Sequence, residues 1–211
     1  MRLVLIGPGS IDKHVLLIGM TEDECKKQIK EIARKIAGHE IVLLPDKGIC
    51  MEIAKECKML LGKKQKIIGT VPIKDKDFGI KHLEQYMDLT VLYDGKEIKI
   101  FDKFIDTKDW YRQDMQIGLF GHAIIYLGIT LGTMGELSYA YYLYKLSKGK
   151  KEGLKISLKK LHPEIVADET DAFITYIYEP FVPEGLPKEL EFYIHDSGGD
   201  IKSLKSISKP V

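Results

Sequence analysis

The chain has 211 residues, and 45% of them are hydrophobic, which is enough to fill the core of one sizeable domain. Its 32 Lys and Arg nearly balance its 31 Asp and Glu, so the formal charge of +1 gives no general attraction to nucleic acid or to a membrane surface. We therefore expect any anion-binding site to be local.

The first part of the chain alternates short apolar runs with helical patterns. Apolar runs at 3–6, 41–44 and 66–71 each stop at a glycine or proline, as strands buried on both faces of a parallel sheet do. Helical periodicity predicts helices at 22–37 and 48–61 between them. This order predicts an α/β fold with a Rossmann-like, doubly wound, mostly parallel sheet and helices on both faces.

The pattern is less regular after residue 72. Residues 73–87 are expected to form a loop or a short helix, and the runs 89–93 and 98–105 flank Asp94–Gly95, a pair typical of hairpin turns. Three further elements are predicted: a helix at 109–120, a buried strand at 123–127 and a helix at 133–146. On the last helix we expect Tyr139, Tyr142, Leu143 and Leu146 to face the core.

The domain organisation follows from a change of pattern after Gly149. We predict a Rossmann-like nucleotide-binding domain over residues 1–149 and a small C-terminal appendage packed on it over 150–195, with one strand near 172–178. Residues 196–211 have little to bury, and we expect them to form a flexible tail.

The cysteines, histidines and apolar runs bear on metal binding and on the cellular compartment of the protein. Its three cysteines are an odd number without metal-like spacing, which favours free thiols in a reducing compartment. The six histidines form no paired ligand spacing, so we predict no metal and no cofactor. No apolar run reaches the length of about 18 residues that a membrane span needs. We expect a cytoplasmic protein, and its high charge is typical of thermophiles.

Candidate ligand-binding residues follow the predicted strands, because ligands of doubly wound sheets lie beyond the strands' carboxyl ends. The segments are Gly7–Ser10, Asp46–Gly48, Gly69–Thr70 and Gly128–Glu136. From them we predict phosphate or nucleotide contacts by Gly7, Gly9, Ser10, Asp46, Lys47, Gly48, Gly128, Thr130, Gly132 and Thr133.

Each of these segments also has a purely structural interpretation. Thr133 and Glu136 have the spacing of a capping box, in which both side chains only satisfy helix donors. The Gly7–Ser10 turn serves equally well as a tight bend. Arg112 is placed to bind a phosphate near the crevice, or to pair with Asp109 or Asp114 on the surface.

Three blocks of the sequence resemble the SLOG superfamily of Rossmann-like nucleotide binders, and within it the LONELY GUY-type proteins once called lysine decarboxylases. The blocks are Ile6–Ser10, Lys47–Cys57 with Ile67–Pro72, and His122–Glu136, the last of which contains Gly-Thr-x-x-Glu. The resemblance covers roughly residues 1–147. It implies that Gly132 and Thr133 bind the phosphate and that Glu136 and Arg112 are catalytic.

The chain departs from the family pattern at two places. It has Gly128-Ile129-Thr130 in place of Pro-Gly-Gly, and Pro45-Asp46-Lys47 in place of a glycine triplet. Bulkier residues change how closely the backbone approaches a phosphate. These departures bear more on hydrolysis than on binding.

Three functions follow as hypotheses. The resemblance implies hydrolysis of the N-glycosidic bond of a nucleoside 5′-monophosphate, and homodimers are expected from the same resemblance. The alternative is a non-catalytic nucleotide-sensing or ligand-binding module, favoured by the lost motif glycines. A third is a structural subunit whose glycine turns serve packing alone. In the first two the partner is a small phosphate-bearing molecule, with no role for nucleic acid or a membrane.

Overall fold

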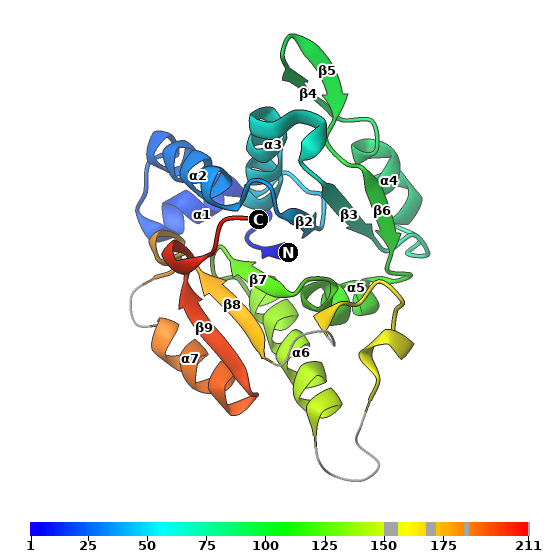
Figure 1. Ribbon diagram of the computed structural model, residues 1–211, viewed down its shortest axis with the longest axis vertical. Coiled ribbons are helices and arrows are strands. Elements are labelled where there is room, and N and C mark those ends of the chain that lie inside the picture. The colour runs from blue at the N-terminus through cyan, green and yellow to red at the C-terminus, as the bar shows by residue number, and fades with distance from the viewer. Residues whose placement is uncertain (150–155, 168–171, 184–185, 211) are drawn as a thin grey trace.

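The computed structural model describes residues 1–149, 156–167, 172–183 and 186–210 (Figure 1). Its centre is a seven-stranded sheet in which every neighbouring pair of strands is parallel. Across the sheet the strands are β6 (Lys103–Asp106), β3 (Ile67–Val71), β2 (Glu40–Leu43), β1 (Arg2–Ile6), β7 (Ala123–Tyr126), β8 (Phe173–Ile177) and β9 (Gly199–Ser203). The predicted α/β, Rossmann-like architecture is confirmed.

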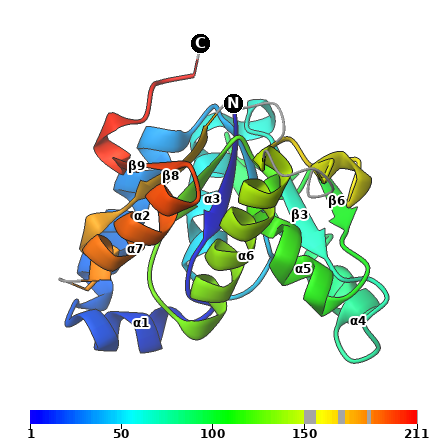
Figure 2. The ribbon, with the colours of Figure 1, turned by 90° about the horizontal axis from the view of Figure 1, so that it is seen from below.

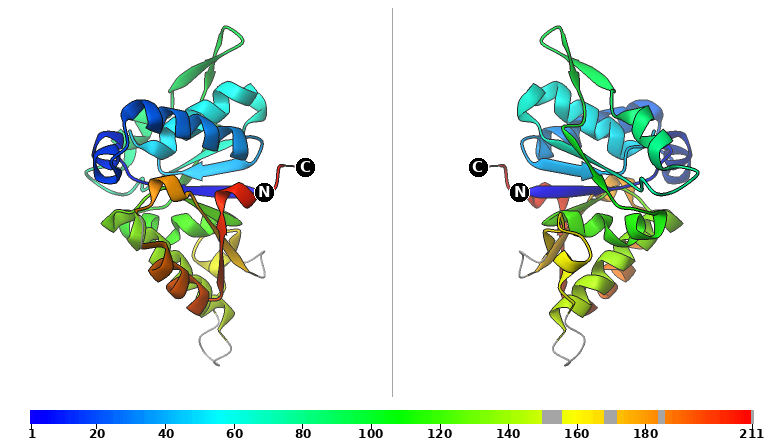
Figure 3. Two further views of the ribbon diagram at one scale, coloured as in Figure 1. Left: turned by 90° about the vertical axis from the view of Figure 1, so that its left-hand side faces the viewer. Right: turned by 90° about the vertical axis from the view of Figure 1, so that its right-hand side faces the viewer.

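Helices cover both faces of this sheet, as the two side views in Figure 3 show. One face carries α1 (Ile11–Ile18), α2 (Glu22–Ile36) and α3 (Ile49–Leu61), and the other carries α5 (Trp110–Gln116), α6 (Leu131–Lys148) and α7 (Leu186–Asp196). Along β1 the side chains alternate: Leu3 and Leu5 join the first core, and Val4 and Ile6 join the second. Both faces are therefore apolar, as the uninterrupted apolar runs predicted.

The strand segment predicted at 98–105 is divided between two sheets. Asp94 and Gly95, with φ of 50° and 70°, turn β4 (Thr90–Tyr93) into β5 (Lys96–Lys99), a hairpin that projects from the body in Figure 1. The chain then enters the main sheet as β6, parallel to β3. The turn prediction is correct. The single long strand is wrong, because the residues after β5 pair with a different neighbour.

The C-terminal part adds two strands to the same sheet. β8 pairs with β7 and β9 pairs with β8. The flexible tail predicted over 196–211 is thus corrected, since Gly199–Ser203 is the edge strand β9. The predicted boundary at residue 149, between a nucleotide-binding domain and a C-terminal appendage, stays a prediction. Positions 150–155, 168–171, 184–185 and 211 lie outside the described residues.

Two helices lie at the carboxyl ends of the strands. No element was predicted for residues 11–20, whereas Ser10 caps the start of α1 and Gly19, with φ of 68°, ends it. The loop or short helix expected at 73–87 contains α4 (Gly79–Tyr86). Figure 2 shows α1 and α4 at the end of the molecule opposite to both termini, which is the end where β1 leads into α1. Within the described residues no helix is both long and apolar enough to cross a membrane.

Candidate functional site

Two of the predicted glycine turns pack directly against each other at this end of the sheet. A Cβ atom on Gly48 would lie 2.2 Å from the carbonyl oxygen of Pro8, and one on Gly9 would lie 3.0 Å from Oδ2 of Asp46. A side chain at Gly48 would require movement of the backbone, whereas one at Gly9 would require the Asp46 side chain to shift. The turns that follow β1 and β2 therefore form one continuous surface, as their positions after neighbouring parallel strands predicted.

Asp46 fills the start of α3. Its Oδ1 accepts a hydrogen bond from the Gly48 amide at 2.7 Å, and the next amide, that of Ile49, donates to the carbonyl oxygen of Pro8 at 3.3 Å. Burial raises the pKa of Asp46 to about 6. Lys47 points to solvent. Two donors at this helix start, the amides of Gly48 and Ile49, are thus used inside the protein, and Asp46 and Gly48 contact each other where a phosphate was predicted.

The start of α6 is capped at Thr130, three residues earlier than the predicted Thr133–Glu136 capping box. Thr130 accepts a hydrogen bond from the Thr133 amide at 3.2 Å, and the Thr133 hydroxyl accepts one from the Thr130 amide at 2.8 Å. That hydroxyl also donates to the Gly128 carbonyl oxygen at 3.0 Å. The amides of Leu131 and Gly132 have no acceptor among the described residues. Gly132 thus offers a free donor, whereas the hydroxyl of Thr133 is engaged internally.

A cavity of about 290 Å³ lies beside this helix start and the start of α1. It is lined by Pro8, Gly9, Ser10, Lys13, His14, Leu17 and Thr130. Ser10 caps α1 by accepting from the Lys13 amide at 3.5 Å, and the amides of Ile11 and Asp12 have no acceptor in the described part of the chain. The capping residues of two helices, Ser10 and Thr130, and the basic residue Lys13 therefore line one cavity. This is the chemistry of an anion site.

Lys13 and His14 were not among the predicted site residues. Their signal in the sequence was Ser10 followed within four positions by Lys and His, which places both on the first turn of a helix. Because no helix was predicted over residues 11–18, these two side chains were not expected beside the Gly7–Ser10 turn.

Three carboxyl groups form a second feature next to the glycine turns. The pKa of Glu136 is raised to about 8, mainly by burial and then by the nearby charges of Asp114 and Asp46. The pKa of Asp114 is also raised by burial. Glu136 therefore keeps a proton at neutral pH, unlike an ordinary surface glutamate. Within the described residues, no group of three or more His, Cys, Asp or Glu side chains is arranged to hold a metal ion.

Arg112 lies on the surface at the start of α5. Its amide donates to Oδ1 of Asp109 at 3.0 Å, and its Nε lies 3.5 Å from Oδ2 of the same carboxylate. The side chains of Arg112 and Asp109 are 57% and 42% exposed, and an ion pair so open to water contributes little to stability. Arg112 does not line the cavity, and it makes the surface pair that the sequence left as its alternative.

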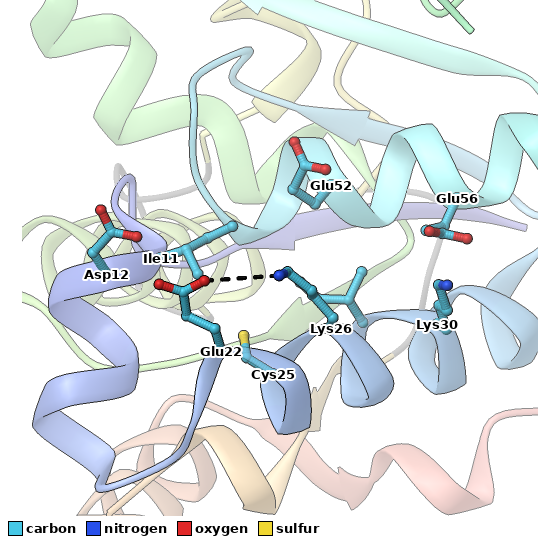
Figure 4. A pocket seen from close by; sticks show the side chains of 9 residues that line it. Ile11, Asp12, Glu22, Cys25, Lys26, Lys30, Glu52 and Glu56 are labelled. Carbon is cyan, nitrogen blue, oxygen red and sulfur yellow. Dashed lines mark ion pairs between the residues drawn. The ribbon is translucent and has the colours of Figure 1, made fainter. Parts of the chain in front are cut away.

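A larger cavity of about 420 Å³ lies between α1, α2 and α3 (Figure 4). Four carboxylates line it, from Asp12, Glu22, Glu52 and Glu56, against the ammonium groups of Lys26 and Lys30. Lys26 is paired with Glu22 at 3.7 Å. The excess of negative charge disfavours an anion here, so the smaller cavity is the candidate site.

Comparison with known proteins finds solved structures that share this architecture. No protein-family model matches the chain, and no curated protein matches its sequence. The molybdenum cofactor carrier protein of Chlamydomonas reinhardtii superposes with a TM-score of 0.54 at 14% identity, over 97% of this chain and 90% of that one. This chain has its fold. The molybdenum cofactor binding protein of the phototrophic bacterium Rippkaea orientalis gives 0.52 at 16% identity, over 97% of this chain and 90% of that one.

Proposed function

We propose that this protein binds a nucleotide or a similar phosphate-bearing small molecule, with the phosphate in the cavity between α1 and α6. One observation carries the proposal: Ser10 and Thr130, the residues that cap the starts of α1 and α6, line a single cavity together with Lys13 and His14. A volume of about 290 Å³ is large enough for a phosphate group and part of the molecule that carries it.

The choice of ligand class rests on two further points. The resemblance to LONELY GUY-type proteins favours a nucleoside 5′-monophosphate. The structural neighbours are named for the molybdenum cofactor, so this cofactor is the second ligand to test. A purely structural subunit is the third hypothesis, and it predicts no response to any phosphate ligand.

A thermal-shift titration tests the proposal. We expect inorganic phosphate and adenosine 5′-monophosphate to raise the melting temperature, because binding to the native state alone stabilises it. Adenosine, which lacks the phosphate, should have a much smaller effect. A Lys13→Ala variant should weaken the response, and Lys26→Ala, a matched change in the acidic cavity, should leave it unchanged. No shift with any phosphate ligand, including the molybdenum cofactor, would remove the proposal.

Hydrolysis of the N-glycosidic bond is the second candidate, and the state of Glu136 favours it. A carboxylic acid that keeps its proton near pH 7 can protonate a departing base, while an ionised neighbour such as Asp46 stabilises positive charge on the sugar. Arg112 would join only if a ligand drew it away from Asp109. Mass spectrometry of ribose 5-phosphate released from a nucleotide panel tests this. Release that is lost in Glu136→Gln while binding persists supports hydrolysis, and no release leaves a binding module.

We also propose that the protein forms a homodimer and works in the cytoplasm. The outer face of α6 exposes Leu131, Tyr139 and Tyr142, an apolar set that pairing of two copies would cover. The three cysteines are free and buried, which fits a reducing compartment. Light scattering coupled to gel filtration measures the mass directly. A Tyr142→Lys variant that stays as large as the wild type would exclude this face as the contact.

A further inference from the structure

His14 is a buried imidazole for which the fold provides no hydrogen bond. The residue is 2% exposed, and neither Nδ1 nor Nε2 has a partner among the described residues. Two other buried histidines use one nitrogen each. The His39 Nε2 lies 3.0 Å from the Ser208 carbonyl oxygen, and His82 is hydrogen-bonded to the backbone of Pro45. Among these three, His14 alone has both nitrogens unengaged within the described part of the chain.

Packing alone does not account for a histidine at this position. The ring meets Phe181 edge to face at a centroid distance of 5.5 Å, a contact that phenylalanine would make without burying unpaired polar atoms. Buried polar groups in native proteins are almost always hydrogen-bonded, so an exception calls for a partner from outside the chain.

The Cε1–Nε2 edge of the ring lies against Gly128, in the turn that precedes α6. A Cβ atom on Gly128 would lie 2.5 Å from Cε1 and 3.1 Å from Nε2 of His14. Gly128 opens the turn that leads to the free amides of Leu131 and Gly132. His14 also lines the cavity together with Lys13 and Ser10. The imidazole thus lies between the two helix starts that attract an anion.

Resting on the proposed function, we propose that His14 is a ligand-binding residue that recognises a phosphomonoester by donating a hydrogen bond from its ring to a phosphate oxygen held between α1 and α6. Burial lowers the pKa of the imidazole, so the ring is neutral in the free protein and still carries one N–H to donate. The phosphate supplies the acceptor that the chain does not. Ligands without a phosphate gain nothing from this residue.

Two measurements on the full-length protein test the assignment. Calorimetric titration compares adenosine 5′-monophosphate and adenosine as ligands of the wild type, His14→Phe, His14→Gln and the control His39→Phe. We expect His14→Phe to lose about tenfold or more in affinity for the monophosphate, as removal of a hydrogen bond to a charged group does. His14→Gln, which keeps an N–H donor, should lose less, and His39→Phe should match the wild type.

Nitrogen-15 spectra of histidine-labelled wild-type protein give the second measurement, which does not depend on how the variants fold. Addition of the monophosphate, or of inorganic phosphate, should shift the ring resonances of His14 and leave those of His39 in place. Unchanged His14 resonances in a wild type that binds the monophosphate would overturn the assignment and leave the proposed function intact. An equal loss of affinity for adenosine would also overturn it, because His14 would then act through packing. A wild type that binds neither phosphate ligand would remove the proposed function and this inference with it.

Discussion

Glu136 should make the folded protein less stable as the pH rises, and a Glu136→Gln variant should lose that dependence. The pKa of the carboxyl group is raised from 4.5 to about 8, by burial first and then by Asp114 and Asp46. Below pH 4.5 the group is protonated in both folded and unfolded chains, so it does not affect the free energy of unfolding. Between pH 4.5 and about 8 only the unfolded chain releases the proton, so stability falls.

The size of the effect follows from the same interval. Each pH unit within it lowers the free energy of unfolding by about 1.4 kcal/mol, which accumulates to about 3 kcal/mol at pH 7. This is an upper bound, because part of Glu136 contacts water, which stabilises its charge. Glutamine has the same shape and no proton to lose. The variant should therefore be more stable than the wild type at pH 7 by up to about 3 kcal/mol, and equal to it near pH 4.

Urea unfolding of both proteins from pH 4 to pH 9 measures this difference. A Glu84→Gln control removes an exposed carboxylate on α4 and should follow the wild type throughout. If the difference between Glu136→Gln and the wild type stays constant with pH, the proton on Glu136 is not linked to folding. The reasoning about its buried surroundings would then be wrong.

Three further predictions test the turns and the edge strand. Gly128→Ala forces alanine to a φ of +144° against His14 and should lower stability by about 1–3 kcal/mol in thermal melts, whereas an unchanged melt would show that the turn relaxes. Thr130→Ala removes the cap of α6 and should cost about 1 kcal/mol in urea unfolding, with Thr130→Ser keeping most of it; equal losses would exclude the hydroxyl as the cause. Gly199→Ala brings a Cβ atom within 2.1 Å of the Tyr141 ring and should lower the melting temperature by several degrees, while no change would argue against β9 in the sheet.

The strands that could be predicted from the sequence are those buried on both faces of the sheet. The central strands are apolar at nearly every position, so their runs identified them and their order gave the fold class. The edge strand β9 has the sequence Gly-Asp-Ile-Lys-Ser and keeps most of its side chains partly in solvent. An edge strand needs only one neighbour, so its sequence carries little apolar signal. That is why residues 196–211 resembled a tail.

The core-facing residues predicted on α6 were right at Leu143, which is buried, and wrong at Tyr139 and Tyr142. Tyrosines occupy several faces of this helix, so the apolar stripe through Tyr139 and Tyr142 looked as good as any other. These two side chains are 46% and 60% exposed, and Tyr141 and Tyr144 are buried in their place. Periodicity identifies a helix, but it does not select the buried face when apolar residues surround the axis.

The sequence predicted the segments of the candidate site, but not which of their donors are free. Three of the four predicted segments follow the neighbouring strands β2, β1 and β7, and parallel topology brings them together, whereas Gly69 and Thr70 lie within β3. Which amides remain free depends on hydrogen bonds that spacing does not reveal. The Thr133 hydroxyl has local acceptors and donors, whereas the Leu131 and Gly132 amides have no described acceptor. Free and used donors are adjacent along the chain, so only coordinates separate them.

The carboxylate of Asp46 explains how the chain differs from the pattern that it resembles. A glycine triplet after the second strand would leave the start of α3 open to a ligand's phosphate, whereas Asp46 places an anion of its own on the Gly48 amide. A second anion there would be repelled by the charge of Asp46 and by any charge on Glu136. The attraction that remains is at α1 and α6, beside Lys13. In the proposed function, a ligand's phosphate would therefore lie on the Lys13 side of the Gly7–Ser10 turn, and its uncharged part on the side of the carboxyl groups.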